Sequence, residues 1–101
     1  IEIKVAGAKD FNQARRAALS IANSSLFKTA VYGENPNFGR IAAAVGASGV
    51  KASEKHLKIK VSPLRKKDIT VNVALGAGKA NAVVYTSDLT PEYIKINAEY
   101  N

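Results

Sequence analysis

The chain has 101 residues, enough for one small domain with a modest hydrophobic core. It carries a formal net charge of +7 and no cysteine, which excludes disulfides and thiolate metal sites. No apolar run reaches the roughly 18 residues that a membrane-spanning helix needs, so no such helix is expected.

The beginning of the chain predicts a strand. Ile1, Ile3 and Val5 alternate with charged residues, a period of two that is typical of a half-buried strand, and Gly7 is expected to end it. The sequence contains no methionine, although translation begins with one. We therefore expect the chain to be a processed product, an excised piece or the ordered part of a longer protein.

A helix is predicted next. Asp10 and Gln13 have the spacing of a capping box, and the helix should run to about Ala22. Arg15 and Arg16 are expected on its outer side. The residues predicted to form its buried stripe are Phe11, Ala14, Ala18, Ile21 and Ala22.

A short strand is expected over residues 28–32, followed by a second helix. Asn35 suits the N-cap of this helix and Pro36 its first position, where the missing N–H costs nothing. The helix should end near Gly46 or Gly49. Its apolar residues are Ile41, Ala42, Ala44 and Val45.

The last part of the chain predicts strands over residues 57–61, 69–75 and 81–86, and a short helix over 91–97. The loop Gly76-Ala77-Gly78 separates the last two strands, which indicates a hairpin. This order of elements predicts an α+β fold with a mixed, partly antiparallel sheet and two main helices, in a single domain over residues 1–101.

Basic residues gather in one segment, with Glu54 as its only acid. They are Lys51, Lys55, Lys58, Lys60, Arg65, Lys66 and Lys67. One hypothesis is an acidic partner, a nucleic acid or a membrane surface. We favour the other, a solvated strand face that could lie opposite an acidic surface of a missing chain, because Lys58 and Lys60 alternate with apolar residues.

Three stretches carry a family resemblance. Residues 35–40, Asn-Pro-Asn-Phe-Gly-Arg, resemble the Asp-Pro-Asn-Trp-Gly-Arg segment of the ornithine acetyltransferases (glutamate N-acetyltransferases) of arginine biosynthesis. Residues 88–100, Asp-Leu-Thr-Pro-Glu-Tyr-Ile-Lys-Ile-Asn-Ala-Glu-Tyr, are similar to that family's C-terminal ending. Residues 21–33 are similar to its passage from helix to strand. The three matches come in the family's order.

The resemblance implies an acyltransferase that cuts itself into α and β chains. The new N-terminal Thr of the β chain is the nucleophile, and it moves acetyl from N2-acetylornithine to glutamate. This chain would be the C-terminal part of the β chain, with a fragment of the DmpA-like fold. Its partners would be the α chain, the N-terminal part of the β chain and the small-molecule substrates, in a cytoplasmic hetero-oligomer. No cofactor, metal, nucleic acid or membrane partner is expected.

No catalytic residue is expected in this chain, because its first residue is Ile1 and none of its threonines matches a nucleophile motif. The resemblance assigns substrate binding to Asn97, for which the alternative is a helix-end residue that satisfies backbone groups. For Asn37 and Arg40 the functional hypothesis is that they hold a substrate carboxylate or brace the active-site loops. The alternative is a structural corner in which Arg40 hydrogen-bonds carbonyls. His56 has no cysteine or spaced carboxylates nearby and is expected to be a surface residue rather than a metal ligand or a base.

The predicted function is therefore that of a segment that helps to close the substrate pocket and to hold subunits together, without activity of its own. The alternative is a free-standing basic α+β module that binds nucleic acid. We disfavour the alternative because no aromatic residues interleave with the basic segment to stack on bases.

Overall fold

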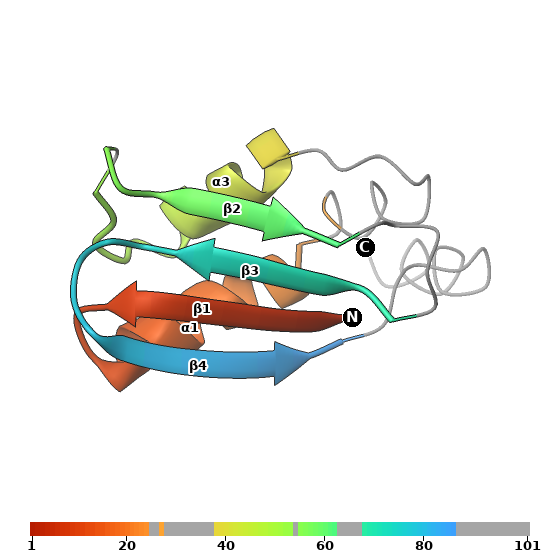
Figure 1. Ribbon diagram of the computed structural model, residues 1–101, viewed down its shortest axis with the longest axis horizontal. Helices are drawn as coiled ribbons and strands as arrows, with labels where there is room; N and C mark the ends of the chain where they lie inside the picture. Colours follow the sequence, from red (N-terminus) through yellow and green to blue (C-terminus); the bar gives the residue numbers. More distant parts are fainter. Residues whose placement is uncertain (25–26, 28–37, 54, 63–67, 87–101) are drawn as a thin grey trace.

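The computed structural model describes residues 1–24, 27, 38–53, 55–62 and 68–86. In this part of the chain the regular elements form one layer of helices and one sheet (Figure 1). In chain order they are β1 (Glu2–Ala8), α1 (Phe11–Ala22), α3 (Phe38–Ala47), β2 (Lys58–Val61), β3 (Thr70–Ala74) and β4 (Ala80–Tyr85). The strand expected over 28–32, the cap at Asn35, and the helix expected over 91–97 lie outside the described residues.

The four strands form one sheet in the order β2-β3-β1-β4. β1 is parallel to β3 and antiparallel to β4, and β2 is antiparallel to β3. The sheet is thus mixed and partly antiparallel, and the α+β prediction is confirmed. The expected strands over 57–61, 69–75 and 81–86 agree with β2, β3 and β4 to within one residue at each end.

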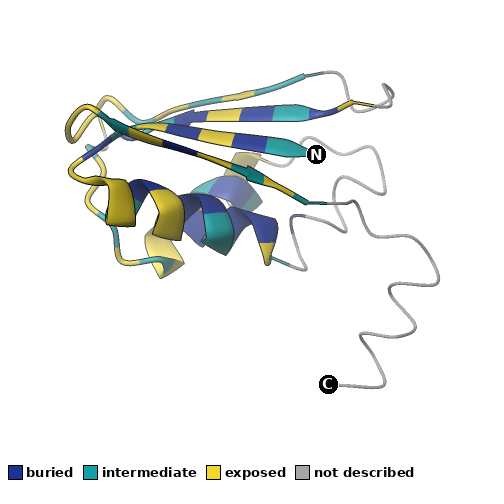
Figure 2. Cartoon of the chain, turned by 90° about the horizontal axis from the view of Figure 1, so that it is seen from below, coloured by how far each residue is buried: buried dark blue, intermediate teal, exposed yellow. Residues whose placement is uncertain are grey.

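Both helices cover the same face of the sheet (Figure 2). Alternate residues of the strands point into this layer, and the side chains of Ile3, Val71 and Leu75 are completely buried there. The alternation agrees with the period of two in the sequence. The opposite face of the sheet is not covered by any described element, as Figure 2 shows.

Helix α1 begins and ends where the sequence predicts. The Asp10 carboxylate accepts a hydrogen bond from the Gln13 backbone N–H at 2.8 Å, as in a capping box. The Gln13 side chain makes a contact outside the capping box. Its Oε1 accepts a hydrogen bond from the Lys51 N–H at 3.1 Å. This contact joins the start of α1 to the segment that follows α3.

The predicted stripe of α1 is wrong at one position. Ala14, Ala18, Ile21 and Ala22 are buried, and so is Ala17, but Phe11 is 61% exposed. Side chains of an α-helix lean toward its N-terminus. Phe11 is the first helical residue, so its ring leans beyond the helix rather than onto the sheet.

Gly7 does not end β1, contrary to the prediction. It has a φ of +71°, and the pairing of β1 with β4 shifts its register between Val5 and Ala8. A glycine with positive φ accommodates such a bulge without strain, and the strand continues to Ala8.

The predicted hairpin of the last two strands is also wrong, because β1 lies between β3 and β4. The connecting turn passes over the end of β1, where the N–H groups of Ala77 and Gly78 each donate to the Gly7 carbonyl at 2.8 Å. A central β1 pairs along both of its edges, and its Ile3 and Val5 are at most 1% exposed. Local proximity of two strands does not reveal this long-range pairing.

Helix α3 packs on α1 through small residues. Its Ile41, Ala44 and Val45 are buried and Ala42 is half-buried. The Ser20 hydroxyl of α1 donates a hydrogen bond to the Ala44 carbonyl at 2.6 Å. The two helices therefore approach closely, and α3 ends at Ala47, within the expected range.

Candidate functional site

The structure places one of the three predicted substrate-binding residues. Arg40 lies in the first turn of α3 and is half-buried, directly before the buried Ile41. Asn37 and Asn97 lie outside the described residues. The described chain therefore leaves the substrate-binding roles of all three residues as predictions.

β1 begins and β4 ends at the same end of the sheet (Figure 1). The backbone ladder closes there through two hydrogen bonds, from the Ile1 amine to the Thr86 carbonyl at 2.7 Å and from the Thr86 N–H to the Ile1 carbonyl at 2.9 Å. Thr86 is the last described residue before the segment that holds Asn97.

His56 is exposed, as expected for a surface histidine. Its Nδ1 lies 2.8 Å from the Ser53 hydroxyl, within the turn that precedes β2. The Ser53 N–H donates to the Leu75 carbonyl at 2.9 Å, which ties this turn to the end of β3. No group of three or more histidine, cysteine, aspartate or glutamate side chains in the described chain could hold a metal ion.

The uncovered side of the sheet carries a basic, concave surface, which we call the open face. It encloses about 520 Å³ and is lined by polar and charged side chains from all four strands. The residues that define it here are Lys4, Lys58, Lys60, Asn72, Asn81 and Val83. The strand register explains their convergence, since Lys60 is opposite Asn72, Asn72 opposite Lys4, and Lys4 opposite Val83.

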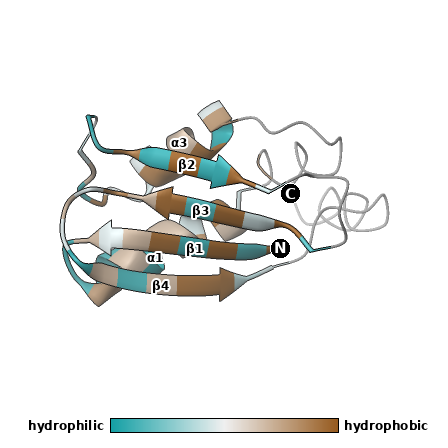
Figure 3. Ribbon diagram, viewed as in Figure 1, coloured by the Kyte–Doolittle hydropathy of each residue, from teal (hydrophilic) through white to brown (hydrophobic). Residues whose placement is uncertain are grey.

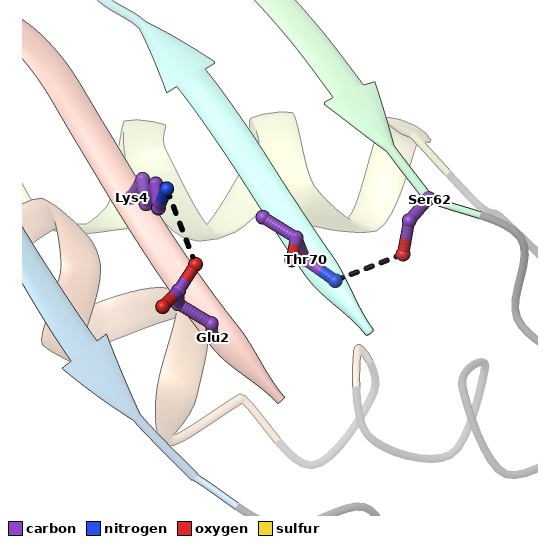
Figure 4. Close-up of polar contacts among 4 residues, drawn as sticks. All are labelled: Glu2, Lys4, Ser62 and Thr70. Carbon is purple, nitrogen blue, oxygen red and sulfur yellow. Dashed lines mark hydrogen bonds and ion pairs between the residues drawn. The ribbon is translucent and has the colours of Figure 1, made fainter. Parts of the chain in front are cut away.

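One acidic residue borders the open face. Glu2 lies 3.3 Å from the Lys4 ammonium, and the two side chains are 28% and 50% exposed (Figure 4). An ion pair this exposed contributes about 0–1 kcal/mol to stability. Figure 4 also shows the Ser62 hydroxyl accepting a hydrogen bond from the Thr70 N–H at 2.9 Å, which holds β2 to β3 at this end.

The open face differs from one edge to the other. β2 contributes the two lysines, whereas β4 is mainly hydrophobic (Figure 3). Val83 is 47% exposed and Tyr85 is 74% exposed. Both occupy alternate positions of β4 that point away from the helices.

The sequence indicated Lys58 and Lys60 as a strand face but did not connect them with Lys4. The alternation around Lys4 predicts that its side chain points to the exposed face of the strand. The residues that lie opposite Lys4 depend on the parallel pairing of β1 with β3. Of the remaining basic segment, Lys51 and Lys55 are exposed outside the sheet, and residues 65–67 lie outside the described chain.

Among the described residues, the arrangement is that of a binding surface. The described threonines, Thr70 and Thr86, lie within the fold, and their backbone groups form hydrogen bonds at the sheet. None of the described helices is long and apolar enough to cross a membrane.

Comparison with known proteins supports one family. The family model described as ArgJ matches residues 1–65 and 60–101. The "Arginine biosynthesis bifunctional protein ArgJ" of Geobacter sulfurreducens is 40% identical over 99% of this chain, which covers 31% of that protein. The protein of the same name from Agrobacterium fabrum is 40% identical, again over 99% of this chain and over 29% of its own length. The chain thus spans less than a third of these relatives.

A solved structure agrees with this result. The crystal structure of arginine biosynthesis bifunctional protein argJ from Bacillus halodurans matches with a TM-score of 0.87 and 29% sequence identity. The match covers 98% of this chain and 56% of that one.

Proposed function

The chain belongs to the ArgJ family, and on that premise we propose that it is the C-terminal segment of an N-terminal-Thr acyltransferase that moves acetyl from N2-acetylornithine to glutamate. The observation that carries the proposal is the 40% identity to arginine biosynthesis bifunctional proteins over 99% of the chain. The similarity of fold to the Bacillus halodurans protein supports it.

The proposal divides the chemistry between segments of one protein. The nucleophilic Thr, activated through its N-terminal amine, and the donors that stabilise the tetrahedral intermediate belong to the parts outside this chain. This segment contributes polar groups that hold the substrate. Asn97 hydrogen-bonds the bound substrate, and Asn37 and Arg40 hold a substrate carboxylate.

Arg40 supports this division because of its position. A half-buried guanidinium in the first turn of α3 combines a permanent positive charge with the backbone N–H groups of a helix start. Both N-acetylornithine and glutamate carry carboxylates. The proposal further includes assembly with the α chain and the N-terminal part of the β chain, and a cytoplasmic location.

The experiment that tests the proposal uses the complete protein that contains this chain. Purified and self-cleaved, it should transfer labelled acetyl from N2-acetylornithine to glutamate and should restore growth of an arginine auxotroph that lacks this activity. A folded, cleaved protein that transfers no acetyl group between these substrates would refute it.

A further inference from the structure

We propose that the open face is a docking surface, and that its occupant is an acidic surface of the remainder of the same protein. The inference rests on the proposed function, and it adds the location and chemistry of the contact between this segment and its partner. It is carried by three properties of the described residues: an uncovered sheet face, an excess of positive charge on it, and exposed apolar side chains along its other edge.

The first property is the missing layer. The helices of an α+β protein gather on one face of its sheet, and here α1 and α3 cover one face and leave the other open to a further partner (Figure 2). The open face is hollowed, with about 520 Å³ between side chains from all four strands. Small residues form its floor, since Ala6 and Ala74 lie between Lys4 and Lys58 in the lining. Such a floor lets another surface approach the strands.

The second property is charge. Lys4 is paired with Glu2, but Lys58 and Lys60 form no ion pair with any described residue. Both are exposed on the same short strand, two positions apart and therefore on the same side. Carboxylates on an opposing surface would complement them.

The third property is the apolar flank. Val83 and Tyr85 of β4 are exposed at the edge of the open face away from Lys58 and Lys60, where Val83 lies opposite Lys4 and Tyr85 opposite Glu2 in the strand register. Exposed aromatic and aliphatic side chains beside charged ones are typical of protein interfaces, whose centres are apolar and whose rims are polar. A surface that binds only small anions would not need exposed apolar side chains at its edge.

The identity of the occupant follows from charge and length. A second copy would offer the open face little negative charge, because Glu2, the carboxylate among the described residues of that face, is already paired with Lys4. The matched relatives are much longer, since this chain covers only 31% and 29% of them. Most of the surface of such a protein therefore lies outside this chain, and it is available to this face at high effective concentration.

Lysine labelling of the complete native protein tests the proposal directly. A limiting amount of an amine-acetylating reagent is added, and the acetylation of each lysine is followed by mass spectrometry. Lys58 and Lys60 should react about tenfold more slowly than Lys9, Lys55 and Lys79, which are exposed and lie off the open face; this ratio corresponds to an opening free energy of about 1.4 kcal/mol. In denaturant the rates should become equal.

A pair of double variants sharpens the test. Lys58→Glu with Lys60→Glu should raise the labelling rate of Lys4 to that of Lys9, because the opposing surface is repelled. Arg15→Glu with Arg16→Glu changes the charge equally on the exposed side of α1 and should leave Lys4 unchanged. Circular dichroism verifies that each variant is folded. If a variant does not fold, the labelling rates of the unmodified protein decide the test.

Three results would overturn the proposal. One is equal labelling of the two groups of lysines in the native protein. Another is protection that depends on protein concentration, which would indicate a second copy. The third is protection that requires added oligonucleotide, which would favour a nucleic-acid-binding module. Labelling does not depend on acetyl transfer, so protected lysines in a protein without that activity would refute the proposed function and leave the docking surface standing.

Discussion

Gly78 shows how a single residue sets the arrangement of the sheet. Its N–H donates to the Gly7 carbonyl, and a Cβ at this position would lie 2.4 Å from the Ala8 carbonyl oxygen. That oxygen belongs to the backbone and cannot rotate away. The close approach lets the turn pass over β1, so that β3 and β4 lie on opposite sides of it.

Gly78→Ala should lower the free energy of unfolding by about 1–3 kcal/mol, because the added methyl group forces the turn away from β1. Denaturant titration of the complete protein measures this loss. Gly46→Ala is the matched control, since a Cβ there meets nothing within 4 Å. It lies inside α3, and alanine should raise stability by about 0.4–1 kcal/mol. Equal stability of the two variants would contradict the proposed role of Gly78.

The effect of Asn97→Ala is likewise a prediction about a single residue. In the complete enzyme it should lower kcat/KM for N2-acetylornithine by about 5- to 150-fold, since losing one hydrogen-bond partner in a buried site costs about 1–3 kcal/mol. Self-cleavage should be unaffected, because the residues that perform it lie elsewhere in the protein. Steady-state kinetics and gel analysis measure both properties.

Asn12→Ala, on the exposed start of α1, provides the control with the same change of side chain and should leave the kinetics unchanged. A precursor carrying Asn97→Ala that fails to cleave would make Asn97 a structural residue. Unchanged kinetics in a folded enzyme would also count against its role in binding.

At the scale of elements, the contact between α1 and α3 includes small residues and the half-buried Ser20 hydroxyl. Ala17, Ala18 and Ala44 allow α1 and α3 to approach, and Ser20 uses this proximity to reach the Ala44 carbonyl. The same carbonyl accepts a hydrogen bond from the Ser48 N–H at 3.1 Å. The position of α3, and with it the position of Arg40, therefore depends on a contact between two helices.

Ser20→Ala should lower the free energy of unfolding by only about 0.5–1.5 kcal/mol, because the Ala44 carbonyl keeps its bond to Ser48 and is not left unsatisfied. If α3 positions Arg40 for substrate, KM for the carboxylate substrates should rise as well. Ser20→Thr retains the hydroxyl and is the appropriate comparison. A fall of several kcal/mol in the free energy of unfolding of Ser20→Ala would show that the hydroxyl stabilises the protein through more than this one hydrogen bond.

At the scale of the whole molecule, the chain is a layer of helices on one sheet, with the other side of the sheet uncovered by described residues. The net charge of +7 lies partly on that side. Such a structure is suited to act within a larger assembly, in agreement with the small share of its relatives that it covers.

The 101-residue chain by itself should not transfer acetyl groups. The proposed nucleophile is a threonine at the start of a β chain, and none of the threonines of this chain matches a nucleophile motif. Labelled N2-acetylornithine and glutamate, incubated with the purified chain, should give no product above the uncatalysed rate. The complete protein serves as the positive control. Turnover by the isolated chain would refute the proposed division of labour.

Sequence alone determined the features that depend on near neighbours in the chain. The alternation in β1 and β3, the cap at Asp10 and the small-residue pattern of α3 are local, and each predicted its element correctly. The resemblance of short motifs to the ornithine acetyltransferases indicated the family that the comparisons found.

Only the tertiary structure decided the order of the strands. Glu2 pairs with Thr70 on one side and Tyr85 on the other, across long stretches of chain. Any of the apolar strands could form such ladders, so the choice depends on packing against α1 and on the close approach of Gly7 and Gly78. The same choice turned the expected hairpin into a crossing over β1. It also placed Lys4 on the same face as Lys58 and Lys60, with Asn72 of β3 between Lys4 and Lys60, because residues opposite one another in a sheet are set by strand order and register rather than by sequence distance.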